Sequence, residues 1–365
     1  MTKKIRICGA FALAAVWLLI TGFAWFAPQK DISAAERRPL DKMPDITVDT
    51  ILDGDFMSDF ESYTLDQFPM RDSFRTLKSL VHKSVMQQLD NNGIYIANGY
   101  AAEMEYPLDE GSVERALKQF QYVYSQYLEN TGSKIYASVV PDKGYYLADR
   151  YGYLSMDYEK LFTKIREGMP FADYVDITDC LTLEDYYRTD THWRQEKLLP
   201  VADRLAKAMG VTAPALESYT QTPIDRPFYG VYYGQAALPM DPDEMYILQN
   251  DMLSQCKVYN FEKNTYTDVY DLEKLTGYDP YDIYLSGAQS LLRIENPNAT
   301  TDRELIVFRD SFSSSLIPLL VQDYATVTLV DIRYVKAPLL GRFLEFNGQD
   351  VLFLYSALVL NKNLI

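Results

Sequence analysis

Apolar positions follow three different patterns along the chain, and the first is an unbroken run near the N-terminus. Residues 7–27 read ICGAFALAAVWLLITGFAWFA without a charge and follow the basic start MTKKIR. A run of this length can span the hydrocarbon core as a helix, and the basic residues before it should stay cytoplasmic. We therefore predict a signal anchor over residues 1–27, with the rest of the chain extracytoplasmic. A cleaved signal peptide is the alternative, but the run is long for one and no small-x-small site follows it.

The second pattern is helical spacing interrupted by short apolar strands. Residues 28–60 are polar and read as a juxtamembrane linker, and a helix is predicted from Phe68 in FPMRDSFRTLKSLVHKSVMQQL. A second helix, SVERALKQFQYVYSQYLENTG, ends at Gly132, which suits a C-cap. KIYASVVP and YVDITD then read as strands, and residues 193–209 as a helix.

The third pattern is a regular alternation of strands and helices in the C-terminal segment. ELIVF, TVTLVDI and DVLFLY are continuous apolar strands, separated by the helical segments SFSSSLIPLLVQDY and YVKAPLLGRFLEF. Such strands indicate a parallel sheet that is covered on both faces. Between about residues 216 and 300 the periodicity weakens, and this part reads as an irregular insertion. The expected fold is one three-layer α/β domain over residues 61–365.

Composition narrows the classes of partner. The chain has 365 residues with a formal charge of -16, and a share of 48% hydrophobic residues is enough for a substantial core. This acidity would repel phosphate backbones, so no nucleic acid partner is expected. Thirty tyrosines suit surfaces that stack on sugar rings, although they also suit the edge of a core.

Cysteine and histidine are too scarce for most metal chemistry. Cys8 lies in the apolar run, so Cys180 and Cys256 could form at most one disulfide. His82 and His192 are the only histidines, which excludes a metal site built on several histidines. His82 reads as a surface or packing residue of its helix. A carboxylate calcium site around DPDE at 241–244 is a weak hypothesis, and no cofactor is expected.

The first candidate for chemistry is a serine at the end of a predicted strand. In open α/β sheets functional groups gather at the carboxyl ends of strands, and Ser311 follows ELIVF in the turn ELIVFRDSF. A serine there can attack a carbonyl, with backbone N–H groups stabilising the oxyanion. The alternative is that Asp310 and Ser311 form an ordinary helix N-cap.

The second candidate is the segment YYRTDTHW at 186–193. Asp190 and His192 fall between a predicted strand and a predicted helix. A nucleophilic serine needs a base, and the base needs an acceptor on its other ring nitrogen. The alternative is that Asp190 or Thr191 caps the helix and His192 packs on Trp193.

Taken together, these motifs resemble those of the DHHW family of bacterial envelope proteins. The resemblance runs over nearly the whole chain after the anchor, in order and spacing, through AERRPL, LDQFPMRD, VVPDKGYYL, YYRTDTHW, FYGVYYG, LIVFRDSF and VDIRY. The family is similar to the alginate O-acetyltransferases AlgJ and AlgX. This chain departs from the family pattern at Thr191, where the name-giving motif has histidine. The alginate enzymes, however, also read Asp-Thr-His-Trp.

The resemblance implies a circularly permuted fold like that of SGNH hydrolases and a role for each residue. Ser311 matches the nucleophile, His192 the general base and Asp190 the carboxylate that orients it. Further candidates are Arg333, for a substrate carboxylate or the oxyanion, Tyr334, for sugar, and more weakly Lys143. For Arg333 and Tyr334 a structural ion pair and a core-edge aromatic are the alternatives. Trp193 is either a packing residue or a wall of the site.

The expected function is a membrane-anchored O-acetyltransferase that acts outside the cytoplasm on an exported or cell-wall polysaccharide. A multipass membrane acyltransferase that supplies acetyl groups is a partner implied by the resemblance alone. A carbohydrate esterase would use the same residues, so the sequence does not separate the two. A scaffold or glycan-binding protein without catalysis is the alternative from a different class.

Overall fold

The computed structural model describes residues 3–33, 35–212 and 215–365 of the chain. Contacts within the chain divide it into two compact units, which are described separately. The first comprises Met1–Asn91 with Ala237–Pro239, and the second Asn92–Ala236 with Met240–Ile365. This division falls between Asn91 and Asn92 in the sequence. The predicted domain boundary at residues 60 and 61 stays a prediction.

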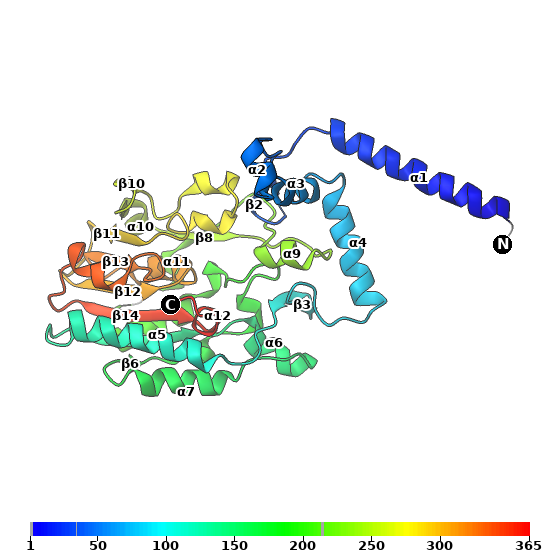
Figure 1. The fold of residues 1–365 in the computed structure, drawn as a ribbon. Helices are drawn as coiled ribbons and strands as arrows, with labels where there is room; N and C mark the ends of the chain where they lie inside the picture. The colour runs from blue at the N-terminus through cyan, green and yellow to red at the C-terminus, as the bar shows by residue number, and fades with distance from the viewer. Residues whose placement is uncertain (1–2, 34, 213–214) are drawn as a thin grey trace. The chain divides into compact units, whose positions relative to one another are not determined.

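The first unit consists of helices and one short β-ladder (Figure 1). Its elements are α1 (Lys3–Phe26), β1 (Ile32–Ser33), β2 (Arg38–Pro39), α2 (Val48–Leu52), α3 (Asp55–Asp66) and α4 (Arg71–Ser84). Within α1, Ile7–Ala24 has a mean hydropathy of 2.2 and is long and apolar enough to cross a membrane. This agrees with a single-pass anchor. The predicted helix after Phe68 is confirmed as α4, and it includes His82.

Two of the quoted motifs meet inside this first unit. Arg38, from AERRPL, holds both carboxylate oxygens of Asp66, from LDQFPMRD, at 2.5 and 2.7 Å. Arg71 of the second motif donates to Glu36 of the first at 2.6 Å. Bidentate arginine–carboxylate pairs fix geometry as well as adding energy. These motifs therefore have a structural role in the first unit.

The second unit is built on an eight-stranded sheet in the order β10-β9-β11-β13-β12-β14-β5-β6. The strands are β5 (Ile135–Val140), β6 (Asp173–Tyr174), β9 (Lys257–Asn260), β10 (Thr265–Thr267), β11 (Leu291–Glu295), β12 (Glu304–Arg309), β13 (Thr326–Val330) and β14 (Asp350–Ser356). The five strands from β13 to β6 are parallel. The strands β10, β9 and β11 join them in antiparallel pairs. The expected α/β fold with a central parallel sheet is confirmed.

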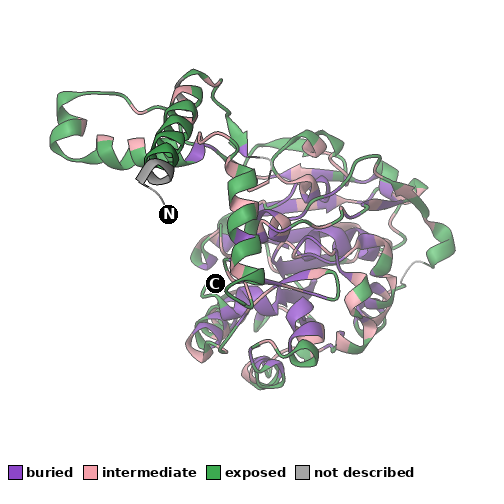
Figure 2. Cartoon of the chain, turned by 90° about the vertical axis from the view of Figure 1, so that its right-hand side faces the viewer, coloured by how far each residue is buried: buried purple, intermediate pink, exposed green. Residues whose placement is uncertain are grey.

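Both faces of the sheet are covered, because side chains along each central strand alternate between two cores. In β12, Leu305 and Val307 pack into a core shared with α8 (Leu199–Met209). Ile306 and Phe308 face the opposite core, formed with α5 (Glu110–Val123) and α7 (Tyr158–Gly168). This two-sided burial gives three layers, and Figure 2 shows the buried residues gathered in the strands.

The remaining helices and strands of the second unit are short and lie mostly around this sheet. They are β3 (Ile94–Ala97), β4 (Tyr100–Glu103), α6 (Lys143–Tyr151), β7 (Thr220–Pro223), α9 (Val231–Ala236), β8 (Tyr246–Gln249), α10 (Asp251–Gln255), α11 (Ser313–Leu316) and α12 (Ala357–Asn361). A π-helical turn, Tyr124–Leu128, extends α5.

Several predicted elements are shorter than expected, and one region is more regular. YVDITD contributes only Tyr174 to a strand, and the helix expected from residue 193 begins at Leu199 as α8. Of the two helices expected after Ser311 and from Tyr334, the first is the short α11 followed by a 3-10 turn, Ile317–Leu320, and the second is only a 3-10 helix, Ala337–Arg342. Both 3-10 segments have a proline in their first turn. The insertion expected to be irregular supplies β9, β10 and β11, so it extends the sheet.

Candidate active site

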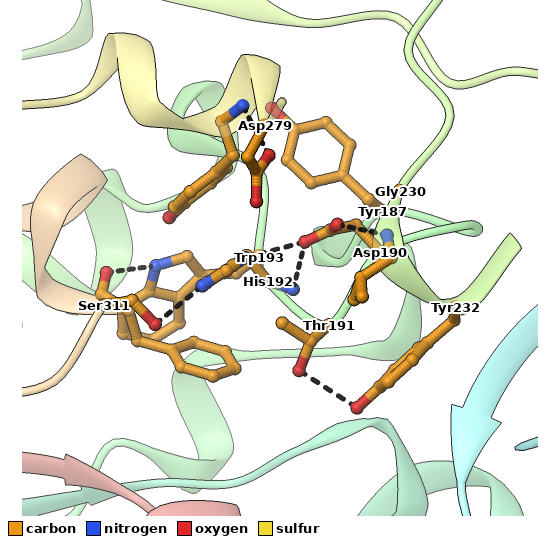
Figure 3. Close-up of polar contacts among 12 residues, drawn as sticks. Tyr187, Asp190, Thr191, His192, Trp193, Gly230, Tyr232, Asp279 and Ser311 are labelled. Atoms are coloured by element: carbon orange, nitrogen blue, oxygen red, sulfur yellow. Dashed lines mark hydrogen bonds and ion pairs between the residues drawn. The ribbon is translucent and has the colours of Figure 1, made fainter. Parts of the chain in front are cut away.

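Ser311, His192 and Asp190 form a continuous hydrogen-bonded chain (Figure 3). The Oγ atom of Ser311 lies 2.8 Å from Nε2 of His192, and Nδ1 of His192 lies 2.6 Å from Oδ1 of Asp190. A carboxylate only accepts hydrogen bonds, so Nδ1 carries a hydrogen and Nε2 is free to accept from the serine hydroxyl. The structure thus brings together the three residues that the sequence proposed as a triad.

Both oxygens of Asp190 are held by backbone groups as well. Oδ1 accepts from the backbone N–H of His192 at 3.0 Å, and Oδ2 accepts from that of Val231 at 2.9 Å. The side chain is fully buried. Neither Asp190 nor Thr191 caps a helix, because the next helical turn starts at Gln195. The alternative of a capped helix start is therefore wrong.

Segment 186–193 is a tight loop, and Gly230 packs directly against it. Tyr187 N donates to His192 O at 3.1 Å, which closes the loop. A Cβ atom on Gly230 would lie 2.3 Å from the Cα of Asp190, so only glycine fits there. The Gly230 N–H also donates to Thr189 Oγ1 at 2.9 Å. This gives the motif FYGVYYG a specific place beside the candidate triad.

Asp243 holds the same loop from the inserted region. Its carboxylate accepts from the N–H groups of Arg188 and Thr189 at 2.9 and 2.8 Å, and from the Thr189 hydroxyl at 2.6 Å. These protein donors occupy the oxygens that a calcium ion would need. Among the residues that the structure describes, no group of three or more histidine, cysteine, aspartate or glutamate side chains could hold a metal. The calcium hypothesis at 241–244 finds no support.

Ser311 follows β12 in a turn that Asp310 stabilises. Asp310 accepts from the N–H of Phe312 at 3.0 Å and from that of Ser356 at 2.7 Å, which joins the ends of β12 and β14. Helix α11 has Phe312 at its N-cap, without a side-chain cap. Of the two residues in the alternative N-cap, Asp310 thus holds the turn before α11, whereas the half-buried hydroxyl of Ser311 caps nothing and faces His192.

The imidazole of His192 contacts two aromatic rings. The ring of Tyr281 stacks on it with centroids 3.8 Å apart and an interplanar angle of 8°. The centroid of the Phe312 ring lies 4.9 Å from that of the imidazole, and the two rings are tilted by 52° to each other. The Tyr281 hydroxyl is 2.8 Å from Ser315 Oγ. Sequence reasoning missed Tyr281, because it is one of thirty tyrosines and belongs to the inserted region.

Trp193 is a packing residue and not an exposed wall of the site. It is fully buried. Its Nε1 donates to Phe312 O at 2.8 Å and to Ser315 Oγ at 3.1 Å. It thus ties the histidine loop to the serine turn. The expectation that Trp193 contacts substrate is corrected, since no part of it is accessible.

Lys143 is also inaccessible, which overturns its assignment to substrate binding. Only 1% of its surface is exposed. Its Nζ donates to the carbonyl oxygens of Tyr187 at 2.9 Å and of Arg188 at 3.3 Å. Burial lowers the pKa of Lys143 to about 7. A lysine in this position can support the loop but cannot contact a polymer.

Arg333 and Tyr334 differ in their surroundings. Arg333 donates to both oxygens of Asp331, at 2.8 and 2.6 Å. Burial alone would lower the pKa of Arg333, but the bonds to Asp331 outweigh it and raise that pKa. Its guanidinium is thus committed to a structural ion pair. Tyr334, by contrast, is 60% exposed and can meet a ligand.

The cysteines and the second histidine add no chemistry here. Cys180 and Cys256 are both free thiols in the structure, without the disulfide that was open from the sequence. Burial raises the pKa of Cys256 to about 11, so this thiol is unreactive. His82 lies in α4 of the first unit.

Comparisons with known proteins agree with this fold. The DHHW protein family profile matches residues 179–330, a range that contains Asp190, His192 and Ser311. Curated proteins give no match. A crystal structure of a DHHW family protein from Eubacterium siraeum is similar with a TM-score of 0.61 and 20% identity, over 74% of this chain and 93% of that one.

Two further solved structures are similar. Bacillus cereus PatB1 with a sulfonyl adduct has a TM-score of 0.59 and 17% identity, over 74% of this chain and 97% of that one. The O-acetyltransferase domain of Pseudomonas putida AlgJ has a TM-score of 0.43 and 15% identity, over 74% of this chain and 92% of that one. Residues 179–330 are therefore similar to the DHHW family in sequence, and the chain shares its fold with the Eubacterium siraeum protein.

Proposed function

We propose that this protein is an O-acetyltransferase that works outside the cytoplasm on an exported or cell-wall polysaccharide. The observation that carries the proposal is the hydrogen-bonded chain from Ser311 through His192 to Asp190. A hydroxyl, a base and a buried carboxylate in this order are the requirements for nucleophilic acyl transfer. The motif resemblance to alginate O-acetyltransferases supports acetyl as the group that is moved.

The first step would load the enzyme. Ser311 Oγ attacks the carbonyl carbon of an acetyl ester donor, while His192 Nε2 takes the serine proton. The bond between that carbon and the donor oxygen then breaks, and His192 returns the proton to the departing oxygen. Asp190 keeps the hydrogen on Nδ1 and stabilises the imidazolium that forms. The product is an acetyl ester on Ser311.

The second step would deliver the acetyl group. A sugar hydroxyl gives its proton to His192 Nε2 and attacks the acetyl carbon, and the bond to Ser311 Oγ breaks as the proton returns to that oxygen. With water in place of the sugar the same residues give an esterase. Neither step needs a diffusible cofactor.

Location and partners follow from other features. The apolar span Ile7–Ala24 with its basic N-terminal flank supports a single-pass anchor with the catalytic unit outside. The net charge of -16 disfavours a polyanionic polymer, so a neutral or amino-sugar polysaccharide fits better. Exposed Tyr334 is the remaining candidate for a sugar contact. The multipass membrane acyltransferase stays a partner inferred from the family resemblance.

The test is covalent labelling of Ser311 combined with an acceptor assay. Purified protein should form one adduct with phenylmethanesulfonyl fluoride, located at Ser311 by peptide mass spectrometry. Ser311→Ala should abolish it, whereas Ser254→Ala, a change at an exposed serine of α10, should not. No adduct in the wild type would favour the scaffold alternative.

Acceptor preference separates the two enzymatic alternatives. With an acetyl ester donor, a transferase should release donor alcohol faster when an oligosaccharide is added, and acetylated sugar should accumulate. An esterase should release acetate at a rate that the sugar does not raise. In cells, the transferase proposal predicts that a Ser311→Ala strain loses acetyl groups from its surface polysaccharide.

A further inference from the structure

Lys143 is a charged side chain in a place where charge is costly. It follows β5 at the start of α6, and it is almost completely buried. Burying an ammonium group without strong partners is strongly unfavourable. The proposed mechanism does not use Lys143, so its retention there calls for a different role.

The two carbonyls that Lys143 holds belong to successive peptide groups of the histidine loop. Its Nζ donates to Tyr187 O at 2.9 Å and to Arg188 O at 3.3 Å. The N–H groups of the same two peptides belong to Arg188 and Thr189, and Asp243 accepts from both. Each peptide group is therefore held by a cation on its oxygen and by an anion on its nitrogen.

A third contact links Lys143 to the loop. Its Nζ lies 5.0 Å from the centre of the Tyr232 ring, within range of a cation–π interaction. The Tyr232 hydroxyl donates to Thr191 Oγ1 at 3.0 Å, and Thr191 stands between Asp190 and His192. Lys143 thus supports the loop on both sides of Asp190.

We propose that Lys143 and Asp243 are positioning residues that clamp the peptide groups 187–188 and 188–189 and so keep Asp190 and His192 aligned with Ser311. This inference rests on the proposed function, because it assigns how the same site is kept in register. Charge-assisted hydrogen bonds are about twice as strong as neutral ones. Lys143 and Asp243 are both buried, so the carbonyl and the N–H of each peptide group are held by charges largely shielded from water. A displacement of about 1 Å can cost roughly a hundredfold in rate.

The charge on the clamp is sensitive to pH. Burial lowers the pKa of Lys143 to about 7, and the charges of Asp190, Asp243 and Asp142 oppose that change. These three carboxylates face Lys143 from the loop, from the inserted region and from its own chain neighbour, and Tyr187 and Tyr232 complete its polar surroundings. Above about pH 7 the ammonium becomes neutral, and the bonds to the two carbonyls lose their charge assistance.

The experiment measures how fast phenylmethanesulfonyl fluoride modifies Ser311 in the full chain in detergent. Lys143→Met keeps the length of the side chain but removes the donors, and the rate should fall roughly 10- to 100-fold. Asp243→Asn should act in the same direction. The double variant should lose no more than about the larger single loss, since both changes release the same peptide groups. Lys118→Met, at an exposed position of α5, is the matched control.

A pH series adds a measurement that a purely structural role would not change. Lys143→Arg keeps its charge at every pH, so the ratio of its rate to that of the wild type should rise between pH 6 and 9. A constant ratio would overturn the charge-dependent clamp. Should Lys143→Met fail to fold, Asp243→Asn and this ratio decide the question by themselves.

The outcomes also separate this inference from the proposed function. If Lys143→Met and Asp243→Asn react at the wild-type rate while Ser311→Ala is unlabelled, the clamp is wrong and the nucleophile stands. If the wild type is not labelled at Ser311, the proposed function fails first. Equal melting temperatures of Lys143→Met and the wild type, with a slower reaction, would show that the loss comes from misalignment and not from unfolding.

Discussion

Asp190 Oδ1 contacts two nitrogen atoms of His192, the ring Nδ1 at 2.6 Å and the backbone N at 3.0 Å. One carboxylate oxygen therefore fixes both the orientation of the imidazole and the turn that carries it. This arrangement keeps the hydrogen on Nδ1, which leaves Nε2 as the acceptor for Ser311. The catalytic role that we propose for Asp190 depends on this tautomer.

The first prediction is that Asp190→Asn inactivates without unfolding. An asparagine can keep the acceptor for the His192 backbone N–H, although not also the one for the Val231 N–H, and it does not supply the negative charge that stabilises an imidazolium. We expect the rate of acetyl ester turnover to fall roughly 10³- to 10⁴-fold. Stopped assays with a chromogenic acetyl ester would measure this fall, with Asp225→Asn at an exposed position as the control. A loss smaller than tenfold would speak against a base that depends on Asp190.

The second prediction concerns the ring that stacks on His192. Tyr281 lies parallel to the imidazole at 3.8 Å, so its face meets any positive charge that forms there. Such contacts contribute about 0.5–2 kcal/mol. Tyr281→Leu should therefore slow turnover roughly 3- to 30-fold, whereas Tyr281→Phe keeps the stack and should stay within about threefold of the wild type.

Tyr278→Leu is the control for these two variants, because Tyr278 is 50% exposed. Ser315 Oγ still accepts from Trp193 in Tyr281→Phe, so loss of the tyrosine hydroxyl leaves that oxygen with a partner. Equal rates for Tyr281→Phe and Tyr281→Leu would mean that stacking does not contribute.

The third prediction is that Gly230→Ala displaces the loop. The new methyl group would lie 2.3 Å from the Cα and 2.4 Å from the backbone N of Asp190, and neither backbone atom can move alone. Overpacking of this kind costs about 1–3 kcal/mol. We expect a lower melting temperature and a larger loss of Ser311 labelling than the loss of folded protein explains.

Gly111→Ala is the matched control for that change. Its methyl group would meet only the ends of two side chains, Asp109 and Arg115, at 3.2 and 3.3 Å. It lies in α5, where alanine is favoured over glycine by up to about 1 kcal/mol. Wild-type stability and labelling in Gly230→Ala would show that the loop tolerates a shift of this size.

The fold was largely predictable because the central strands carry their signal locally. After their first residues, Glu304 and Asp350, ELIVF and DVLFLY are apolar at every position, since both faces of β12 and β14 are buried. Strands β9 and β10 are short and partly exposed, so no comparable run marks them. Their place in the sheet depends on pairing with distant residues. The segments before α8 and after β13 were predicted to begin too early, because apolar residues at helical spacing precede Pro200 and Pro338, which stand in the first turn of the helices that form.

In the candidate site, the sequence could predict only those residues that a short local motif marks. Asp190 and His192 are two residues apart, and Ser311 stands at the end of a clear strand. The groups that hold them, such as Gly230, Asp243 and Tyr281, come from a region whose periodicity is weak, and their contacts span about 40 to 90 residues. Sequence spacing placed Lys143 at the correct strand end. It could not show that the side chain turns inward to main-chain carbonyls.

The fourth prediction uses a buried carboxylate beside that lysine. Asp142 Oδ1 accepts from Tyr158 Oη at 2.8 Å and from the Gly144 N–H, whereas Oδ2 is buried and has no hydrogen-bond partner within the described part of the chain. Burial raises the pKa of Asp142 from 3.8 to about 6. The folded state thus binds this proton more tightly than the unfolded state does. The resulting stabilisation is complete below pH 4 and is lost as the pH rises through 6.

An amide at this position stays neutral at every pH and keeps the acceptor for both donors. Relative to the wild type, Asp142→Asn should therefore gain stability between pH 4.5 and pH 8, by an amount on the order of 3 kcal/mol. Melting temperatures in matched buffers should show a difference that grows by several degrees across this range. Asp149→Asn, at an exposed position of α6, should show no such trend. A difference that stays constant with pH would mean that Asp142 does not change its charge in the folded protein over this interval.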